Sequence, residues 1–307
     1  MTTQAAPPLA MTRAGHVALL GPSNAGKSSL LNRFLGRRLS AVSGKPQTTR
    51  ERVLGVDTQG QVQIVFVDTP GLVEPAYLLH HAMLEQVGRA ASGADLLALV
   101  IDAAAPLPAL APEWLSRLLA LEERVIPVLN KIDATPPGRL ERARRWVTDS
   151  FGKEPFELSA LTGQGVDVLR RELGRRLPFS PFLYPADDIA ERPVRYFAGE
   201  LVREAVFDLY AEEIPYSVAV RVDEFRERGD HVYIRATIFV ERSSQKGILL
   251  GRKGTKLREL GSEARRRVEE FTGSRVFLDL WVKVLPKWRK DPGALRRLGF
   301  DLPNPDR

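Results

Sequence analysis

The residues from Gly21 to Ser28 read GPSNAGKS, a complete match to the phosphate-binding pattern GxxxxGK[ST]. Glycines in such a loop let backbone N–H groups surround phosphate oxygens, and the positive end of the next helix faces the same charge. We expect Lys27 to reach the outer phosphates of a nucleotide and Ser28 to bind Mg²⁺. The nucleotide contacts expected here are Gly21, Asn24, Ala25, Gly26, Lys27, Ser28 and Ser29. A glycine turn that merely connects a strand to a helix is the alternative.

A second group of residues supplies oxygen ligands and a nucleotide sensor. Asp68-Thr-Pro-Gly71 follows an apolar run, so the Asp68 carboxylate can hold Mg²⁺ through water and the Gly71 amide can sense the γ-phosphate. In the segment 47–50, QTTR, a threonine is expected to complete the Mg²⁺ coordination only when the γ-phosphate is present. Both Thr48 and Thr49 are candidates.

The segment Asn130-Lys-Ile-Asp133 indicates which base is bound. The Asp133 carboxylate can accept two hydrogen bonds from the N1–H and the exocyclic amine of guanine, which adenine does not offer in that place. We expect Asn130 to hold the loop and read the base edge, with the stem of Lys131 over the ring. In the tripeptide Ser159-Ala160-Leu161, the Ala160 amide would bond the guanine oxygen. These motifs favour a GTP site over that of an ATPase or a small-substrate kinase.

Strands followed by helices must position these motifs. Short apolar runs at 17–20, 62–69, 95–102, 124–130 and 155–160 alternate with stretches of helix length. This pattern predicts an α/β domain at residues 14–178, with a mostly parallel sheet and helices on both faces. Residues 1–13 are expected to form a disordered extension, and the proline-rich residues 179–193 a linker.

A second, smaller α+β domain is expected at residues 194–300, with residues 286–307 as its tail. A helix over 194–214 precedes two alternating strands joined by a polar turn at 228–230. Gly251-Arg-Lys-Gly254 then leads into a helix ending near Phe271, and a last strand covers 275–284. The two glycines would let the backbone of a single RNA strand approach, and the two cations would meet phosphates. A helix-connecting turn is the alternative for an isolated GxxG.

Composition narrows the class of protein. The 307 residues include no cysteine, which excludes disulfide scaffolds and thiolate metal sites and leaves hard cations such as Mg²⁺ and K⁺. The net charge is +7, but residues 242–297 hold 16 Lys or Arg against 6 Asp or Glu, so the basic excess surrounds the GxxG loop. The longest apolar run, 94–101, is too short to span a membrane, and we expect a soluble protein.

Several conspicuous side chains have structural interpretations. Trp281 lies in an alternating strand and is expected in the core, whereas Trp288 either stacks on a base or covers the domain edge. The arginine run 265–267 is expected on a solvated helix face, with phosphate steering as the alternative. His80 and His81 have no partner at metal-ligand spacing and are expected to be ordinary helix residues.

The nucleotide motifs resemble those of translation-factor-class GTPases, and the second domain resembles a type II KH domain. Their pairing, with the ending LDLWVKVLPKWRKDPGALRRLGF, closely resembles the Era family of bacterial GTPases from about His16 to Phe300. The resemblance implies a monomer that exchanges GTP and GDP, binds the 3′ end of the small-subunit (16S) rRNA and assists maturation of the 30S subunit. It also implies a cytoplasmic location with loose peripheral association with the cell membrane.

The resemblance also implies roles for single residues. Thr49 is favoured over Thr48 because it directly precedes Arg50, and the catalytic set becomes Lys27, Thr49, Asp68 and Gly71. Leu72 stands where Ras-like enzymes carry a water-orienting glutamine, so hydrolysis should be slow unless RNA stimulates it. The implied RNA contacts and groove walls are Lys246, Ile248, Leu249, Gly251, Arg252, Lys253, Gly254 and Lys256.

Asn24 matches an asparagine that binds K⁺ in potassium-activated GTPases; satisfying the loop backbone is its alternative role. The family's loop usually reads GxPNVGKS, whereas here the proline comes one position earlier and Ser23 and Ala25 replace proline and valine. The phosphate and Mg²⁺ ligands and Asn24 itself stay in place, so the departure bears on the potassium geometry and not on nucleotide binding. A second function class also stays open, an RNA-binding structural protein whose nucleotide only stabilises the fold.

Overall fold

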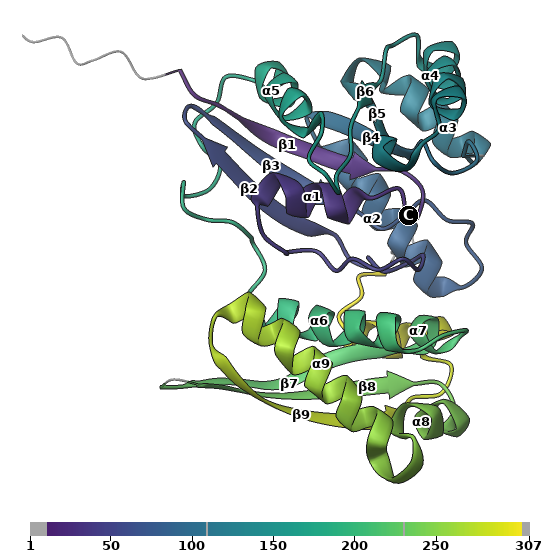
Figure 1. Ribbon diagram of the computed structural model, residues 1–307, viewed down its shortest axis with the longest axis vertical. Coiled ribbons are helices and arrows are strands. Elements are labelled where there is room, and N and C mark those ends of the chain that lie inside the picture. Colours follow the sequence, from purple (N-terminus) through teal and green to yellow (C-terminus); the bar gives the residue numbers. More distant parts are fainter. Residues whose placement is uncertain (1–10, 109, 230, 303–307) are drawn as a thin grey trace, which may run out of the picture.

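The computed structural model describes residues 11–108, 110–229 and 231–302 of the chain. Residues 1–10 of the expected extension, Asp230 of the expected turn and residues 303–307 of the expected tail lie outside the described residues. Two layered units pack one on the other, as Figure 1 shows. We call residues 13–176 the N-terminal unit and residues 194–302 the C-terminal unit. No helix in the described ranges is long and apolar enough to cross a membrane.

The N-terminal unit is a six-stranded sheet with helices on both faces, which confirms the predicted α/β class. The strand order is β2-β3-β1-β4-β5-β6, and every neighbouring pair is parallel except β2 with β3. Short 3-10 helices span Glu122–Arg124 and Ile132–Ala134. The other elements are β1 (Arg13–Leu20), α1 (Lys27–Leu35), β2 (Val53–Gln59), β3 (Val62–Asp68), α2 (Leu78–Gly93), β4 (Leu96–Asp102), α3 (Pro112–Ala120), β5 (Val125–Asn130), α4 (Pro137–Phe151), β6 (Phe156–Glu157) and α5 (Val166–Arg176).

Strand alternation decides which helices each strand residue meets. In β1, Val17 and Leu19 lie in one core cluster with α1 and α5, whereas Ala18 and Leu20 lie in another with α2, α3 and α4. All four side chains are fully buried. Because both faces are covered, these strands are continuous apolar runs. The loops after β1, β3 and β5 leave the carboxyl ends of the strands, which is where open α/β sheets bind ligands.

The C-terminal unit is a three-stranded sheet, order β7-β8-β9, with α6 and α9 packed on one face. β7 and β8 are antiparallel, and β8 and β9 are parallel. Short 3-10 helices span Arg252–Gly254 and Trp288–Lys290. The other elements are α6 (Val194–Leu209), α7 (Ile214–Ser217), β7 (Ala219–Arg228), β8 (His231–Val240), α8 (Ser243–Leu250), α9 (Thr255–Thr272), β9 (Arg275–Val284) and α10 (Pro292–Arg297).

The elements depart from the expected boundaries at three places. β1 begins at Arg13, inside the segment expected to be disordered, because Arg13 pairs with Val62 of β3 and its N–H donates to the carbonyl of Gln61 at 2.9 Å. β6 is only two residues long, since the chain bends back at Ser159, whose N–H donates to the carbonyl of Gln164. The helix expected over 194–214 ends at Leu209, because Tyr210 is extended and donates its hydroxyl to a carbonyl of α8 at 3.0 Å.

The proline-rich linker covers an edge of the N-terminal sheet. The Val56 N–H of β2 donates to the carbonyl of Ile189 at 2.9 Å. Gln63 of β3 is fully buried, donates to the carbonyl of Tyr184 at 2.9 Å and accepts the Leu183 N–H at 2.8 Å. The Val56 bond satisfies a backbone group on the edge strand β2, and the Gln63 bonds hold the linker that leads to the C-terminal unit.

An apolar cluster joins the two units. Trp288 is fully buried, lies in one cluster with Leu79 and Met83 of α2, and donates its indole N–H to the carbonyl of Ser217 at 2.9 Å. It therefore covers the domain edge, which was one of the two expected roles. The other role, stacking on a base, is wrong because the ring is buried. The core position expected for Trp281 is also wrong, because the ring is 54% exposed on the sheet face that α6 and α9 leave open.

Replacing Trp288 by alanine should lower the free energy of unfolding by about 4 kcal/mol, because it empties a packed interface and leaves the Ser217 carbonyl unpaired. Trp281→Ala is the matched control and should cost less than about 1 kcal/mol, since that ring is mostly exposed. Denaturant titration of the full chain measures both variants. Equal losses in the two would contradict this description of the interface.

Candidate functional site

The phosphate loop leaves the carboxyl end of β1 and leads into α1. Gly21 and Gly26 have φ values of +139° and +93°, and a Cβ on Gly21 would lie 2.1 Å from the carbonyl oxygen of Val100. Side chains are therefore excluded at Gly21 by both conformation and space. The loop can curl its N–H groups toward an anion at the start of α1, whose first turn holds no acidic residue.

Lys27 lies beside the loop with its side chain almost fully buried. Its Nζ donates to the carbonyls of Gly21 (3.0 Å) and Pro22 (2.8 Å). Burial lowers the pKa of Lys27 to about 8, and the charge of Asp68 opposes that shift. A phosphate in the loop would favour the charged ammonium, so the lysine is suited to an anionic ligand.

Three oxygen-bearing side chains meet next to Lys27. Ser28 Oγ lies 2.8 Å from Thr49 Oγ1 and donates to Asp68 Oδ2 at 2.7 Å. Asp68 is fully buried, and its Oδ1 has no hydrogen bond of normal geometry to any described residue. Burial raises the pKa of this carboxyl, while the Ser28 hydrogen bond and the charge of Lys27 lower it. Two hydroxyls and an unpaired carboxylate oxygen are ligands that a hard cation prefers, so the cluster fits Mg²⁺.

The segment 38–50, which we call the switch segment, separates the two threonine candidates. Thr49 lies beside Ser28, whereas Thr48 Oγ1 donates to the carbonyl of Lys45 at 2.8 Å. The structure therefore brings Thr49, and not Thr48, to the cation cluster. Asn24 also touches this segment, because its Nδ2 donates to the carbonyl of Gly44 at 2.9 Å. That bond reaches the switch segment and not the backbone of the phosphate loop, which was the alternative partner expected for Asn24.

Gly71 packs directly against the phosphate loop. A Cβ there would lie 2.3 Å from Ser23 Oγ and 2.7 Å from Ser23 Cα, so a larger residue would push the two segments apart. The next amide, that of Leu72, donates to the carbonyl of Gly21 at 3.1 Å. The Leu72 side chain packs against the apolar core and has no polar atom that could orient water.

Asn130 ties the two sides of the site together. Its Nδ2 donates to the carbonyl of Ala25, and its Oδ1 accepts the Ala160 N–H, both at 2.9 Å. These bonds match the loop-holding role predicted for Asn130. The Ala160 amide, predicted to face guanine, is engaged by Asn130 in this structure. Lys131 Nζ lies 2.7 Å from Asp102 Oδ2, and the Asp133 carboxylate is exposed.

Two adjoining cavities are lined by most of the predicted residues, whereas Gly21, Ala25 and Asp68 line neither. One, of about 290 Å³, lies over the phosphate loop and Thr49. The other, of about 730 Å³, is lined on its base side by Asn130, Lys131, Asp133, Ala160 and Leu161. Gly26, Ser29, Val42 and Lys131 line both, so the phosphate and base sides form one continuous site. Ser159 lies behind the base side, fully buried, and accepts the Thr162 N–H at 3.0 Å.

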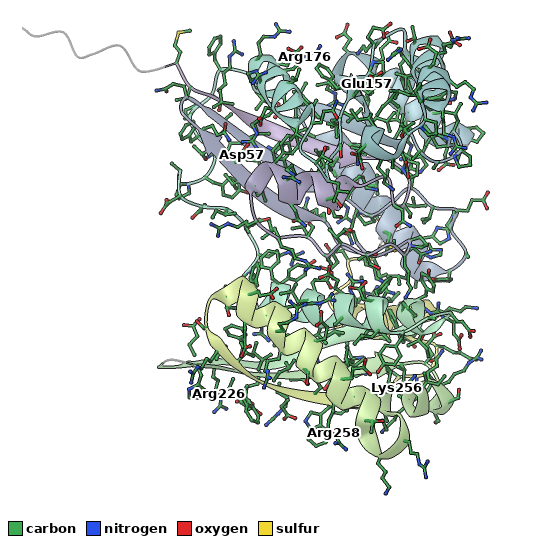
Figure 2. The ribbon with its side chains drawn as sticks, in the orientation of Figure 1. Asp57, Glu157, Arg176, Arg226, Lys256 and Arg258 are labelled. Carbon is green, nitrogen blue, oxygen red and sulfur yellow. The ribbon has the colours of Figure 1, made fainter. Side chains whose placement is uncertain are left out.

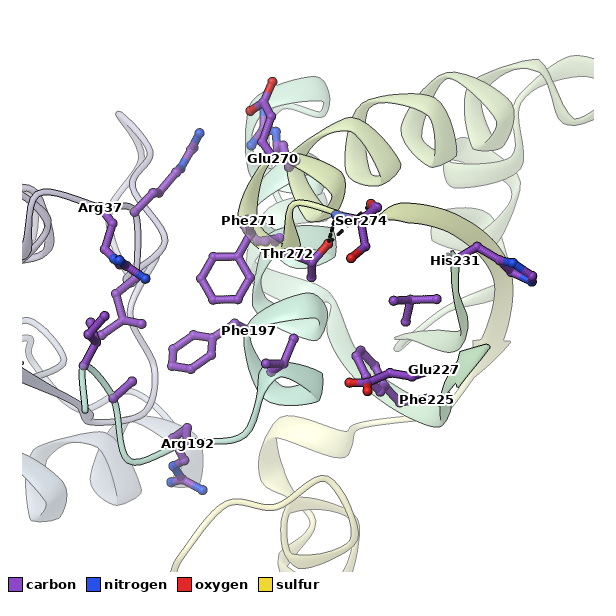
Figure 3. Close-up of a pocket in the computed structure, with 18 of the residues that line it drawn as sticks. Arg37, Arg192, Phe197, Phe225, Glu227, His231, Glu270, Phe271, Thr272 and Ser274 are labelled. Atoms are coloured by element: carbon purple, nitrogen blue, oxygen red, sulfur yellow. Dashed lines mark hydrogen bonds between the residues drawn. The ribbon is translucent and has the colours of Figure 1, made fainter. Parts of the chain in front are cut away.

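A larger cavity, of about 800 Å³, lies between the two units (Figure 3). Arg37 and Arg192 stand on one side of it, and Phe197 and Phe271, whose ring centroids are 5.3 Å apart, on the other. None of the described residues that line it belongs to the predicted site. Cavity volume therefore does not identify the nucleotide site in this molecule, and the motifs do.

The GxxG loop joins α8 to α9 at the end of the C-terminal unit remote from the N-terminal unit, where Figure 2 labels Lys256 and Arg258. Gly251 and Gly254 have φ values of +66° and +76°, and a Cβ on Gly251 would lie 2.7 Å from Lys256 Cγ. Arg252 and Lys253 are exposed. Sequence analysis missed Arg258, which is exposed beside the loop and donates to the carbonyl of Lys253 at 2.9 Å.

Two predictions in this region are wrong. Leu249, predicted as a wall of the RNA groove, is fully buried in the core with α6 and α9, whereas Ile248 is 43% exposed. Arg267, predicted on a solvated helix face, is buried and pairs with Asp208 (2.9 Å) and Glu263 (2.7 Å). Helical spacing alone does not separate these buried residues from their exposed neighbours, because the covering elements are distant in sequence.

Family models and curated relatives match both units. The model described as 50S ribosome-binding GTPase matches residues 16–131, and the KH domain model matches residues 213–289. The chain is 40% identical over 291 residues to GTPase Era of Geobacter metallireducens, covering 94% of this chain and 98% of that protein. It is 38% identical over 294 residues to GTPase Era of Bradyrhizobium sp. (strain ORS 278), covering 95% and 96%.

Two similar solved structures each cover 95% of this chain and 100% of their own at 36% identity. One is Era in complex with MgGDPNP and nucleotides 1506–1542 of 16S ribosomal RNA, with a TM-score of 0.90. The other is a variant of Aquifex aeolicus Era bound to GDP·AlF4⁻, with a TM-score of 0.89. Agreement at this level over nearly the whole chain includes both units and their relative placement.

The low pKa of Lys27 makes nucleotide binding depend on pH. Below about pH 8 the free protein already carries the charged ammonium, so affinity for GTP should be flat. Above about pH 8, Lys27 of the nucleotide-free protein loses its proton, whereas Lys27 beside bound phosphates keeps it. GTP binding should therefore take up a proton, and the affinity should fall as pH rises. Calorimetry at pH 8.5 in two buffers of different ionisation enthalpy measures the uptake. Lys27→Arg, which stays charged, should show none; equal uptake in both proteins would assign the proton to another group.

Proposed function

This chain belongs to the GTPase Era family, and we propose that it couples its GTP site to the 3′ end of the 16S rRNA during assembly of the 30S ribosomal subunit. Family membership makes it a GTPase with a KH domain. One observation carries the proposal: a phosphate loop with its cation cluster in one unit, and an exposed basic GxxG loop at the far end of the other. A similar protein has been solved with this part of the rRNA.

We assign the nucleotide contacts to both sides of the continuous site. The loop amides of residues 21–29 hold the phosphates and Lys27 neutralises their charge. Ser28 and Thr49 ligate Mg²⁺ and Asp68 holds it through water; the ion, when bound, offsets charge on the outer phosphates. A similar protein was solved with MgGDPNP, which supports this cofactor. On the base side, Asp133 reads guanine while Lys131 covers the ring.

Hydrolysis without a partner should be slow. Leu72 offers no group that could orient the attacking water, and Gly71, whose amide is predicted to sense the γ-phosphate, has no side chain that could do so. Stabilisation of the transition state must then come from a group that is added or moved into place. RNA on the KH domain and K⁺ at Asn24 are the two sources we propose.

The proposed RNA surface consists of the GxxG loop, the half-buried Lys246, the exposed Ile248, Lys256 and Arg258. The positive φ of both glycines favours residues without a side chain, and this leaves room for the backbone of a single RNA strand. Leu249 is not part of this surface, because it is fully buried. The cations meet phosphates, and Ile248 gives an unstacked base an apolar contact.

GTP hydrolysis with and without a short single strand from the 16S rRNA 3′ end tests the proposal. We expect RNA to raise the rate, and Arg252→Ala combined with Lys253→Ala to weaken RNA binding about tenfold or more while GTP affinity stays unchanged. Arg266→Ala is the matched control, since that exposed arginine is already paired with Glu263 and Glu270. A rate indifferent to RNA, or parallel losses of GTP and RNA binding, would contradict the proposal.

The potassium proposal has its own test. Replacing K⁺ by Na⁺ should lower the rate about tenfold or more, because a dehydrated cation beside the phosphates stabilises developing charge. Asn24→Ala should abolish the difference between the two ions. Equal rates of the wild-type chain in both salts would contradict the potassium role and leave Asn24 only its hydrogen bond to Gly44 of the switch segment.

A further inference from the structure

The switch segment lies between the N-terminal sheet and α6 of the C-terminal unit, as Figure 1 shows for the chain that follows α1. The Val42 N–H donates to Glu204 Oε1 at 2.8 Å, and Glu204 is fully buried. Lys45 Nζ donates to the carbonyls of Phe207 and Tyr210 at the end of α6. This loop of the GTPase domain therefore donates hydrogen bonds to the KH domain at Val42 and Lys45.

Two buried arginines hold the backbone on either side of Thr49. Arg203 of α6, 2% exposed, donates to the carbonyl of Thr48. Arg50, 3% exposed, donates to the carbonyls of Val218 (2.6 Å) and Pro215 (3.0 Å). The Arg203 guanidinium is itself oriented by Glu200, with Nε 2.9 Å from Oε1. The bond from Arg203 to Thr48 and the bonds from Arg50 to Val218 and Pro215 cross from one unit to the other.

Thr49 lies between these two anchors with its hydroxyl 2.8 Å from Ser28 Oγ. A hydroxyl at this position can ligate a cation only if its backbone is held at the right distance from the phosphate loop. The switch segment has no helix or strand of its own to hold it. The KH domain supplies that support through α6 and the turn after it.

We propose that Arg203 is a positioning residue for GTP hydrolysis: it holds the Thr48 carbonyl and so sets the Thr49 hydroxyl at the Mg²⁺ site. The inference rests on the Mg²⁺ role proposed above for Thr49. It makes the KH domain part of the catalytic support of the GTPase domain. A ligand that moves α6 should therefore change the affinity of the Mg²⁺ site for nucleotide. By linkage, nucleotide should change the affinity for that ligand by the same factor.

Arg203→Ala in the full chain tests the inference. We expect the rate at saturating GTP to fall about 10- to 100-fold and the Mg²⁺ concentration for half-maximal rate to rise, since a ligand is misplaced rather than removed. RNA binding without nucleotide should stay unchanged, which a general loss of folding would not allow. The matched control is Arg195→Ala on the same helix, because Arg195 donates to the carbonyl of Val222 within the KH domain.

A double-mutant cycle identifies the route. If Arg203 acts through Thr49, adding Arg203→Ala to Thr49→Ala should cost no further activity. If the loss of activity in the double variant equals the product of the two single losses, the inference is overturned. An unchanged Mg²⁺ requirement in Arg203→Ala would overturn it too. Arg203→Lys keeps the buried charge beside Glu200 and should give a smaller effect of the same kind if the alanine variant is unstable. A wild-type chain with no GTP turnover would instead overturn the function proposed above.

Discussion

Buried charge at the junction of the two units is the constraint on which the rest of the structure depends. Glu204, Arg203 and Arg50 are each at most 3% exposed. Removing the partner of a buried charge lowers the free energy of unfolding by about 3 to 5 kcal/mol. Much of their pairing crosses the junction: Glu204 accepts the Val42 N–H, and Arg50 donates to carbonyls in α7 and to that of Val218 just after it. Hydrogen bonds have directions that apolar contacts lack, so these pairs set the placement of one unit on the other in a way that the Trp288 cluster alone does not.

The junction also divides the nucleotide site into two kinds of structure. The phosphate loop, Asp68 and Asn130 stand at strand ends and are fixed by the sheet and by glycine conformations. The switch segment is irregular and takes its shape from side chains on both flanks. Asn32 accepts two of its N–H groups at 2.8 Å, and α6 binds the Val42 N–H and the Thr48 carbonyl. Irregular segments held by a few side-chain hydrogen bonds rearrange when those bonds change. The site is therefore rigid at the phosphate loop and adaptable at the switch segment, where it meets the RNA-binding domain.

Much of this molecule could be predicted from its sequence, because the nucleotide motifs are local. GxxxxGKS and NKID each lie within a few residues after an apolar strand, and backbone sterics at Gly21 and Gly26 admit little else. Predictions failed where burial is decided by distant chain. Leu249, Trp281 and Arg267 all lie in regular patterns, but the pattern gives only the period. Which face is covered depends on elements packed from elsewhere in the chain, such as α6, which packs against Leu249 and supplies Asp208 to Arg267.

The sequence by itself determined the fold class, the chemistry of the nucleotide site and the position of the basic GxxG loop, since each follows from residue type and short-range spacing. Only the tertiary structure decided that Thr49 and not Thr48 joins Ser28 and Asp68, and that Arg203, more than 150 positions away, holds the backbone beside it. The physical reason is that burial and hydrogen-bond direction are properties of packed surfaces. A helical pattern marks Arg203 only as one polar residue among several, and the loop laid against it gives that residue its role.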